Sequence, residues 1–149
     1  MSSSPKESLP QKQSSDENHS TSLRLLPVSV IILTFNESKN IADCLESVKE
    51  LTDDIILVDS GSTDDTIAIA ARYSVSVYFH PFEDYSKQRN WAFQNADTKY
   101  PWILNMDADH RLTGELVQEL RSIFLKGISD DVNGFMASRR TMFMGRWIK

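Results

Sequence analysis

A single cysteine, Cys44, stands among the 149 residues of this chain. This excludes an intramolecular disulfide and any zinc site built from several cysteines. The sequence also contains neither Gly-x-x-x-x-Gly-Lys nor Gly-x-Gly-x-x-Gly. These are the two familiar glycine-rich cradles for phosphate, so a nucleotide would have to be held in another way.

Long apolar runs and an excess of positive charge are missing as well. No run approaches the roughly 18 residues needed to span a membrane. The polar residues at the start of the chain contain no apolar core of a signal peptide. The formal net charge of -5 argues against general binding of nucleic acid. Together these absences predict a cytoplasmic protein without a nucleic-acid partner.

The composition that remains is that of a soluble globular protein. Hydrophobic residues make up 40% and charged residues 25% of the chain, and its length suits one domain. Residues 1–26 are serine-rich and polar, and they bury too little apolar surface to offset the entropy lost on ordering. We therefore expect a disordered tail over 1–26 and a domain over 27–149.

Short apolar stretches alternate with stretches of helical periodicity along the domain. Strands are predicted at 28–34, 55–58, 75–79 and 102–106, and helices end near residues 51, 73, 96 and 127. Asn36 or Ser38 is predicted to cap the first helix, and Ser62 with Asp65 to start the second as a capping box. The order predicts an α/β fold with a mostly parallel sheet and helices on both faces.

Two carboxylates close the last predicted strand. Asp107 and Asp109 are separated by one small residue, so in a strand their side chains point the same way. Aligned carboxylates repel each other unless a cation lies between them, and a hard ion such as Mg²⁺ or Mn²⁺ suits this arrangement. The alternative is that Asp-Ala-Asp polarises a loop and caps the next helix.

Other polar residues are predicted to lie near this pair, because ligands of such sheets bind outside the carboxyl ends of the strands. Asp59 ends the second strand and can accept a hydrogen bond from a base or a ribose, or it can cap its own turn. Lys87 and Arg89 open a helix nearby and can neutralise phosphate charge, or they can form a solvated helix face.

At this point the sequence resembles the inverting family 2 glycosyltransferases of the GT-A fold. Four motifs carry the resemblance, in the order that the family shows: Val-Ser-Val-Ile-Ile-Leu-Thr-Phe-Asn-Glu (28–37), Ile-Leu-Val-Asp-Ser-Gly-Ser-Thr-Asp (56–64), Lys-Gln-Arg-Asn-Trp-Ala (87–92) and Leu-Asn-Met-Asp-Ala-Asp (104–109). The branch of lipopolysaccharide-core glucosyltransferases is the most similar. The resemblance covers nearly everything from Pro27 onward.

The resemblance implies a donor site for a nucleotide-diphospho-sugar, expected to be a UDP-sugar, with Mg²⁺ or Mn²⁺. By the same resemblance Asp109 holds the metal, Asp107 reaches the ribose or the metal and its water, and Asp59 contacts the base. The residues implied to line the nucleotide pocket are Thr34, Asn36 and Glu37. The acceptor is expected to be a glycan or a lipid-linked saccharide.

The sequence departs from the family at two places. His110 stands where the family often has an acid, and it is either a neutral ligand or a residue at the start of a helix. The chain also stops at Lys149, before the region in which the family carries its general base, so we expect the base to lie beyond Lys149. The remaining acids after the metal motif are Glu115, Glu119, Asp130 and Asp131. The alternative to an enzyme is an inactive nucleotide-binding remnant without an acceptor half.

The last stretch, 134–149, combines aromatic and methionine residues with arginines. It is predicted to be a strand and connector whose packing partners lie elsewhere. The alternative is contact with the inner face of a membrane or with a lipid-linked acceptor.

Overall fold

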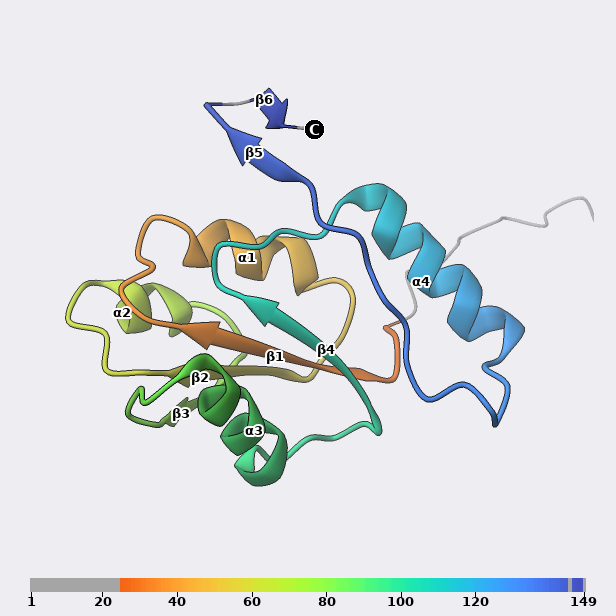
Figure 1. Cartoon of the computed structure of the whole chain (residues 1–149), viewed down its shortest axis with the longest axis horizontal. Coiled ribbons are helices and arrows are strands. Elements are labelled where there is room, and N and C mark those ends of the chain that lie inside the picture. Colours follow the sequence, from red (N-terminus) through yellow and green to blue (C-terminus); the bar gives the residue numbers. More distant parts are fainter. Residues whose placement is uncertain (1–24, 145, 149) are drawn as a thin grey trace, which may run out of the picture.

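The computed structural model describes residues 25–144 and 146–148. It contains one parallel sheet of four strands, and Figure 1 shows their carboxyl ends pointing to one edge of the molecule. The strands are β1 (Val28–Thr34), β2 (Ile55–Asp59), β3 (Ser76–Phe79) and β4 (Trp102–Asp107). Their order across the sheet is β3-β2-β1-β4, so β1 lies between β2 and β4. The predicted parallel α/β sheet is confirmed.

Helices cover both faces of this sheet, as predicted. They are α1 (Ile41–Val48), α2 (Thr66–Ala70), α3 (Tyr85–Asn95) and α4 (Gly114–Lys126). Side chains of α1, α2 and α4 pack in one core cluster with one face of the strands, and α3 packs in the other. No described helix is both long and apolar enough to cross a lipid bilayer.

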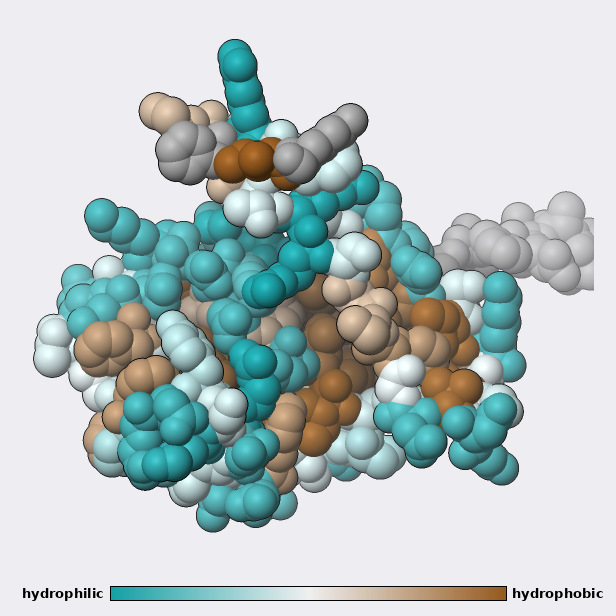
Figure 2. Space-filling model, in the orientation of Figure 1, coloured by the Kyte–Doolittle hydropathy of each residue, from teal (hydrophilic) through white to brown (hydrophobic). Residues whose placement is uncertain are grey.

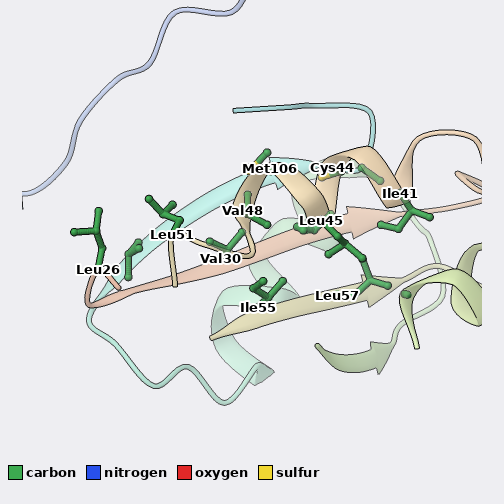
Figure 3. Packing of buried hydrophobic residues seen from close by; sticks show 14 residues of the cluster. Leu26, Val30, Ile41, Cys44, Leu45, Val48, Leu51, Ile55, Leu57 and Met106 are labelled. Atoms are coloured by element: carbon green, nitrogen blue, oxygen red, sulfur yellow. The ribbon is translucent and has the colours of Figure 1, made fainter. Parts of the chain in front are cut away.

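The two central strands are buried along their whole length because they are covered on both faces. Every residue of β1 and β2 is buried, which explains why their sequences are continuous apolar runs rather than alternating ones. β3 lies at the edge of the sheet, and three of its four residues are exposed. The larger core lies between α1 and the strands, as Figure 3 shows.

Cys44 belongs to this core. Its side chain is fully buried on the inner face of α1, and burial raises the pKa of the thiol to about 12. A thiol that stays neutral is a poor nucleophile. Cys44 is therefore a small core residue and not a reactive thiol.

The ends of the domain differ in part from expectation. Leu26, the last residue of the predicted tail, is buried, and its N–H donates to Leu51 O at 2.7 Å. Leu25 is exposed, and the rest of the tail prediction falls on residues 1–24, outside the described part of the chain. At the other end β5 (Thr141–Phe143) and β6 (Arg146–Ile148) form an antiparallel pair. Figure 1 shows this hairpin away from the main sheet, beyond α1.

Candidate functional site

The site lies where β1, β2 and β4 end at one edge of the sheet. In the strand register Thr34 pairs with Asp59, and Leu33 pairs with Asp107. Because the pairing is in register, three strand ends that are far apart in sequence present their following loops together. This register brings 34–37, 59–62 and 107–110 to the same edge of the sheet, as expected for residues that follow the carboxyl ends of parallel strands.

A tight turn follows β4 and orients the two aspartates. Ala108 N–H donates to Leu33 O at 3.0 Å, and His110 N–H donates back to Asp107 O at 2.9 Å. The Ala108 side chain is 2% exposed and packs in the core with α1. Asp109 is exposed and Asp107 is half-buried, so both carboxylates stay outside that core.

A third group joins the aspartates. One ligand atom each from Asp107, Asp109 and His110 lies within 4.8 Å of the other two. His110 Nε2 is 3.7 Å from Asp107 Oδ2 and 3.7 Å from Asp109 Oδ1. The interpretation of His110 as a helix-start residue is wrong, because α4 begins only at Gly114 with Thr113 as its cap.

The donor set fits a hard divalent cation. Two carboxylates can supply oxygens to Mg²⁺ or Mn²⁺, with water and phosphate oxygens completing the shell. The His110 ring is less free to act as a ligand, since Asp107 N–H donates to its Nδ1 at 3.2 Å and the ring proton of the neutral form then lies on Nε2. Arg139 Nη1 also lies 3.2 Å from Nε2, and one neutral ring cannot accept both bonds. The two aspartates are therefore the stronger ligand candidates.

Asp59 is held by its own turn. Its Oδ2 accepts from Gly61 N–H and Ser62 N–H, both at 2.9 Å, and its Oδ1 accepts from the Ser62 hydroxyl at 2.5 Å. Gly61 has φ +98°, a conformation that favours glycine. Three of about four acceptor positions of the carboxylate are occupied, which leaves one for a ligand. The turn-capping alternative for Asp59 describes its contacts in this structure.

Hydrogen bonds join the loop after β1 to the loop after β2. Asn36 N–H donates to Ser62 Oγ, and Asn36 Oδ1 accepts from Thr63 N–H, both at 2.8 Å. Asn36 therefore does not cap α1, whose N-cap is Asn40. The predicted capping box is also wrong: Ser62 bonds to Asn36 and Asp59, and Asp65 makes no side-chain cap bond to α2.

Two further hydrogen bonds join the segment after β1 to the segment after β2. Glu37 N–H donates to Thr66 Oγ1 at 2.8 Å, and Ser38 N–H donates to Asp64 Oδ2 at 3.0 Å. Ser38 thus contributes its backbone rather than a cap. The Glu37 carboxylate accepts from the Asn40 side chain at 2.7 Å, so it bonds to the N-cap residue of α1.

Thr34 contributes a free hydroxyl at the same edge. The residue is 4% exposed, and its buried Oγ1 has no hydrogen-bond partner within the described part of the chain. An orphan hydroxyl at the end of a strand is costly unless a ligand or water satisfies it.

The basic residues of α3 separate into one that reaches the site and one that does not. Arg89 Nη2 lies 3.0 Å from Asp107 Oδ1. Lys87 Nζ lies 2.6 Å from Glu83 Oε2, two residues before α3 begins, and the Lys87 side chain is well exposed. The structure brings Arg89, but not Lys87, to the aspartates.

Sequence reasoning missed Gln88, the residue between them. It is 1% exposed, and its amide donates to Ser60 Oγ at 3.0 Å and to His80 O at 3.1 Å. It thereby joins α3 to the turn after β2. The available signal was its spacing, because Gln88 lies four residues before Ala92 and so on the same face of α3.

Residues 29–147 match the family model described as Glycosyl transferase family 2. The chain belongs to this family. An uncharacterized glycosyltransferase of Rickettsia conorii is 42% identical over 97 residues, which are 65% of this chain and 34% of that protein. The lipopolysaccharide core biosynthesis glycosyltransferase LpsC of Rhizobium meliloti is 32% identical over 125 residues, covering 80% of this chain and 44% of LpsC. This chain thus spans less than half the length of either relative.

A solved structure agrees with the fold of this family 2 domain. S. aureus TarS, residues 1–349, superposes with a TM-score of 0.57 at 22% identity, covering 76% of this chain and 38% of that one. At this identity the likeness concerns the fold alone. The expected GT-A architecture, with a mostly parallel sheet and helices on both faces, is confirmed.

Proposed function

We propose that this family 2 domain binds a nucleotide-diphospho-sugar together with Mg²⁺ or Mn²⁺ at the carboxyl edge of its sheet. One observation carries the proposal: carboxylate oxygens of Asp107 and Asp109 lie within 4.8 Å of each other at the end of a buried parallel sheet. The uncommitted hydroxyl of Thr34 and the remaining acceptor position of Asp59 lie at the same edge. Polar groups at strand ends are where such sheets bind ligands.

In this proposal Asp107 and Asp109 hold the cation. When bound, a divalent ion stabilises the negative charge that develops on the departing diphosphate. Asp59 contacts the base, Thr34, Asn36 and Glu37 line the nucleotide pocket, and Arg89 faces the phosphates. Lys87 would have to leave Glu83 to take the role assigned to it from the sequence.

We propose for the whole protein the transfer of the sugar to an acceptor hydroxyl with inversion. LpsC is named for lipopolysaccharide core biosynthesis, which supports a cell-envelope glycan as the acceptor. The donor in this proposal is a UDP-sugar, as the sequence resemblance implies. The general base is assigned to a region outside this chain, because Glu115 and Glu119 belong to α4, and Asp130 and Asp131 to the segment after it. A cytoplasmic location, with peripheral contact at the membrane, is part of the same proposal.

The test is calorimetric titration of the 149-residue chain with UDP, with Mn²⁺ or Mg²⁺ present and with chelator. We expect binding that requires the cation. Asp109→Ala should weaken UDP binding in the presence of cation at least about tenfold, since even outer-shell changes at metal sites cost that much. Asp97→Asn, an exposed carboxylate after α3, is the matched control and should bind as the unmodified chain does.

Equal UDP affinity with chelator and with Mn²⁺ would exclude the metal role. A chain that binds neither cation nor UDP would overturn the proposal.

A further inference from the structure

Arg89 contacts one of the two proposed metal ligands. Its Nη2 lies 3.0 Å from Asp107 Oδ1, and both side chains are only about one-third exposed, at 37% and 33%. The buried Nε of Arg89 has no hydrogen-bond partner among the described residues. The guanidinium is therefore only partly committed to Asp107, and it keeps donors for another acceptor.

The two oxygens of Asp107 face different groups. Oδ1 accepts from Arg89, whereas Oδ2 faces His110 Nε2 at 3.7 Å, inside the set that could hold a cation. A fixed positive charge on one oxygen lowers the attraction of the carboxylate for a second cation. The same bond holds the carboxylate in place, so Arg89 both orients this ligand and weakens its affinity.

We propose that Arg89 makes the binding of the cation and the nucleotide cooperative. This rests on the proposed function. Without an anion, the guanidinium charge keeps the cation affinity of Asp107 and Asp109 low. A diphosphate supplies negative charge to both the guanidinium and the cation, so each ligand strengthens the binding of the other. Linkage requires this coupling to be equal in both directions.

Neighbouring cations are engaged elsewhere. Lys87 pairs with Glu83, and Arg111 Nη2 lies 2.8 Å from Asp43. Arg139 approaches the site through His110 rather than through a carboxylate. Among the described cations, Arg89 is the one paired with a proposed metal ligand.

The test measures two affinities on the full chain and on Arg89→Gln. Mn²⁺ binding without nucleotide is followed by the electron paramagnetic resonance signal of free Mn²⁺, and UDP binding is measured calorimetrically with and without Mn²⁺. Arg89→Gln should bind Mn²⁺ alone about three- to tenfold more tightly, the size expected when one charge leaves the rim of a partly solvated site. It should bind UDP in the presence of Mn²⁺ more weakly, so the factor by which Mn²⁺ improves UDP binding should fall.

Two variants keep the result interpretable. Arg89→Lys retains the charge without the fork of donors, so its Mn²⁺ affinity should stay near that of the unmodified chain while UDP binding weakens. Lys99→Gln removes one positive charge next to Asp53, at the opposite edge of the sheet, and should change neither affinity. Thermal melts establish that each variant is folded.

The opposite signs of the two effects distinguish coupling from structural damage. Arg89→Gln that weakens Mn²⁺ binding, or that leaves both affinities unchanged while the unmodified chain binds UDP in a cation-dependent way, overturns this inference alone. An unmodified chain that binds neither ligand overturns the proposed function and this inference together.

Discussion

At the scale of single residues, Asn36 has the least replaceable position in the loop after β1. Its φ is +53°, a left-handed conformation that few residues other than glycine adopt readily. Its amide side chain and its backbone both bond to the loop after β2. The residue therefore combines a conformational requirement with a hydrogen-bonding one.

Two substitutions separate these requirements. Asn36→Gly and Asn36→Ala both lose the acceptor for Thr63 N–H, but only alanine is strained at positive φ. We expect Asn36→Ala to be less stable than Asn36→Gly by about 1 kcal/mol, the cost of a left-handed conformation for a residue with a Cβ. Denaturant unfolding of both variants measures the difference. Equal stabilities would show that the loop relaxes to negative φ in the alanine variant.

At the scale of elements, Asp64 joins the start of α1 to the start of α2. Its carboxylate accepts from the Thr66 hydroxyl, from Thr66 N–H at 3.0 Å and from Ser38 N–H at 3.0 Å. These bonds, that from the Thr66 hydroxyl first, hold the pKa of Asp64 well below its ordinary value of 3.8. The ionised form is thus favoured in the folded protein.

This lowered pKa predicts a pH dependence of stability. A carboxyl whose pKa is lower in the folded than in the unfolded chain contributes stability above the unfolded value, and this is lost as the pH falls through 3.8 towards the folded value. Asp64→Asn should therefore be less stable than the unmodified chain at pH 7, and the gap should narrow below about pH 4. Denaturant unfolding at pH 7, 5 and 3 follows it.

Asp65→Asn is the matched control, because Asp65 makes no side-chain cap bond. A gap for Asp64→Asn that is constant from pH 7 to 3 would contradict this account.

These elements show which features local sequence carries. The buried strands β1 and β2 were predictable because both faces need apolar side chains. The predicted helix starts failed at Asn36 and Ser62, because their side chains bond across to the neighbouring loop. Such long-range partners depend on strand order, which the local pattern of residues does not specify.

The candidate site likewise has features that the sequence predicts and features that only the packing of the fold determines. The placement of Asp107 at the end of a strand followed from its position in the sequence. Asp109 instead lies in the turn after β4, where the alternation of a strand does not apply. The contact of Arg89 with Asp107 and the burial of Gln88 depend on how α3 packs against the sheet. Whether Asp59 serves its turn or a ligand depends on donors that only the folded turn supplies.

At the scale of the whole molecule, apolar surface is exposed on the side away from α1 and at the hairpin. Figure 2 shows apolar side chains gathered over β4 between α3 and α4. Ile103 of β4 is 38% exposed, and on the hairpin Met142 and Trp147, which pair across the strands, are 59% and 50% exposed. Exposed apolar surface of this kind favours association.

We predict that the 149-residue chain self-associates as its concentration rises. Replacing Met142 and Trp147 together by threonine should reduce the association, because threonine keeps the strand propensity while removing apolar area. Sedimentation velocity over a range of concentrations measures it.

Leu125→Gln, which removes a well-exposed apolar side chain from α4, is the control and should change little. A chain that stays monomeric throughout would contradict this prediction. Co-sedimentation with anionic vesicles separately tests the alternative of membrane contact for 134–149.

The place of β4 in the sheet also has a consequence for synthesis. Among the strands of the main sheet, β1 is the first to leave the ribosome and β4 is the last, yet the two pair directly, with Val28 opposite Trp102. Pairing between such distant segments forms slowly, because the long intervening chain must be closed before the contact is gained. A nascent chain can therefore pair β1 with β2, and β2 with β3, and form the Asp59 turn before Asp107 and Asp109 are in place. During refolding, the capacity to bind a cation would accordingly be among the last native properties to appear.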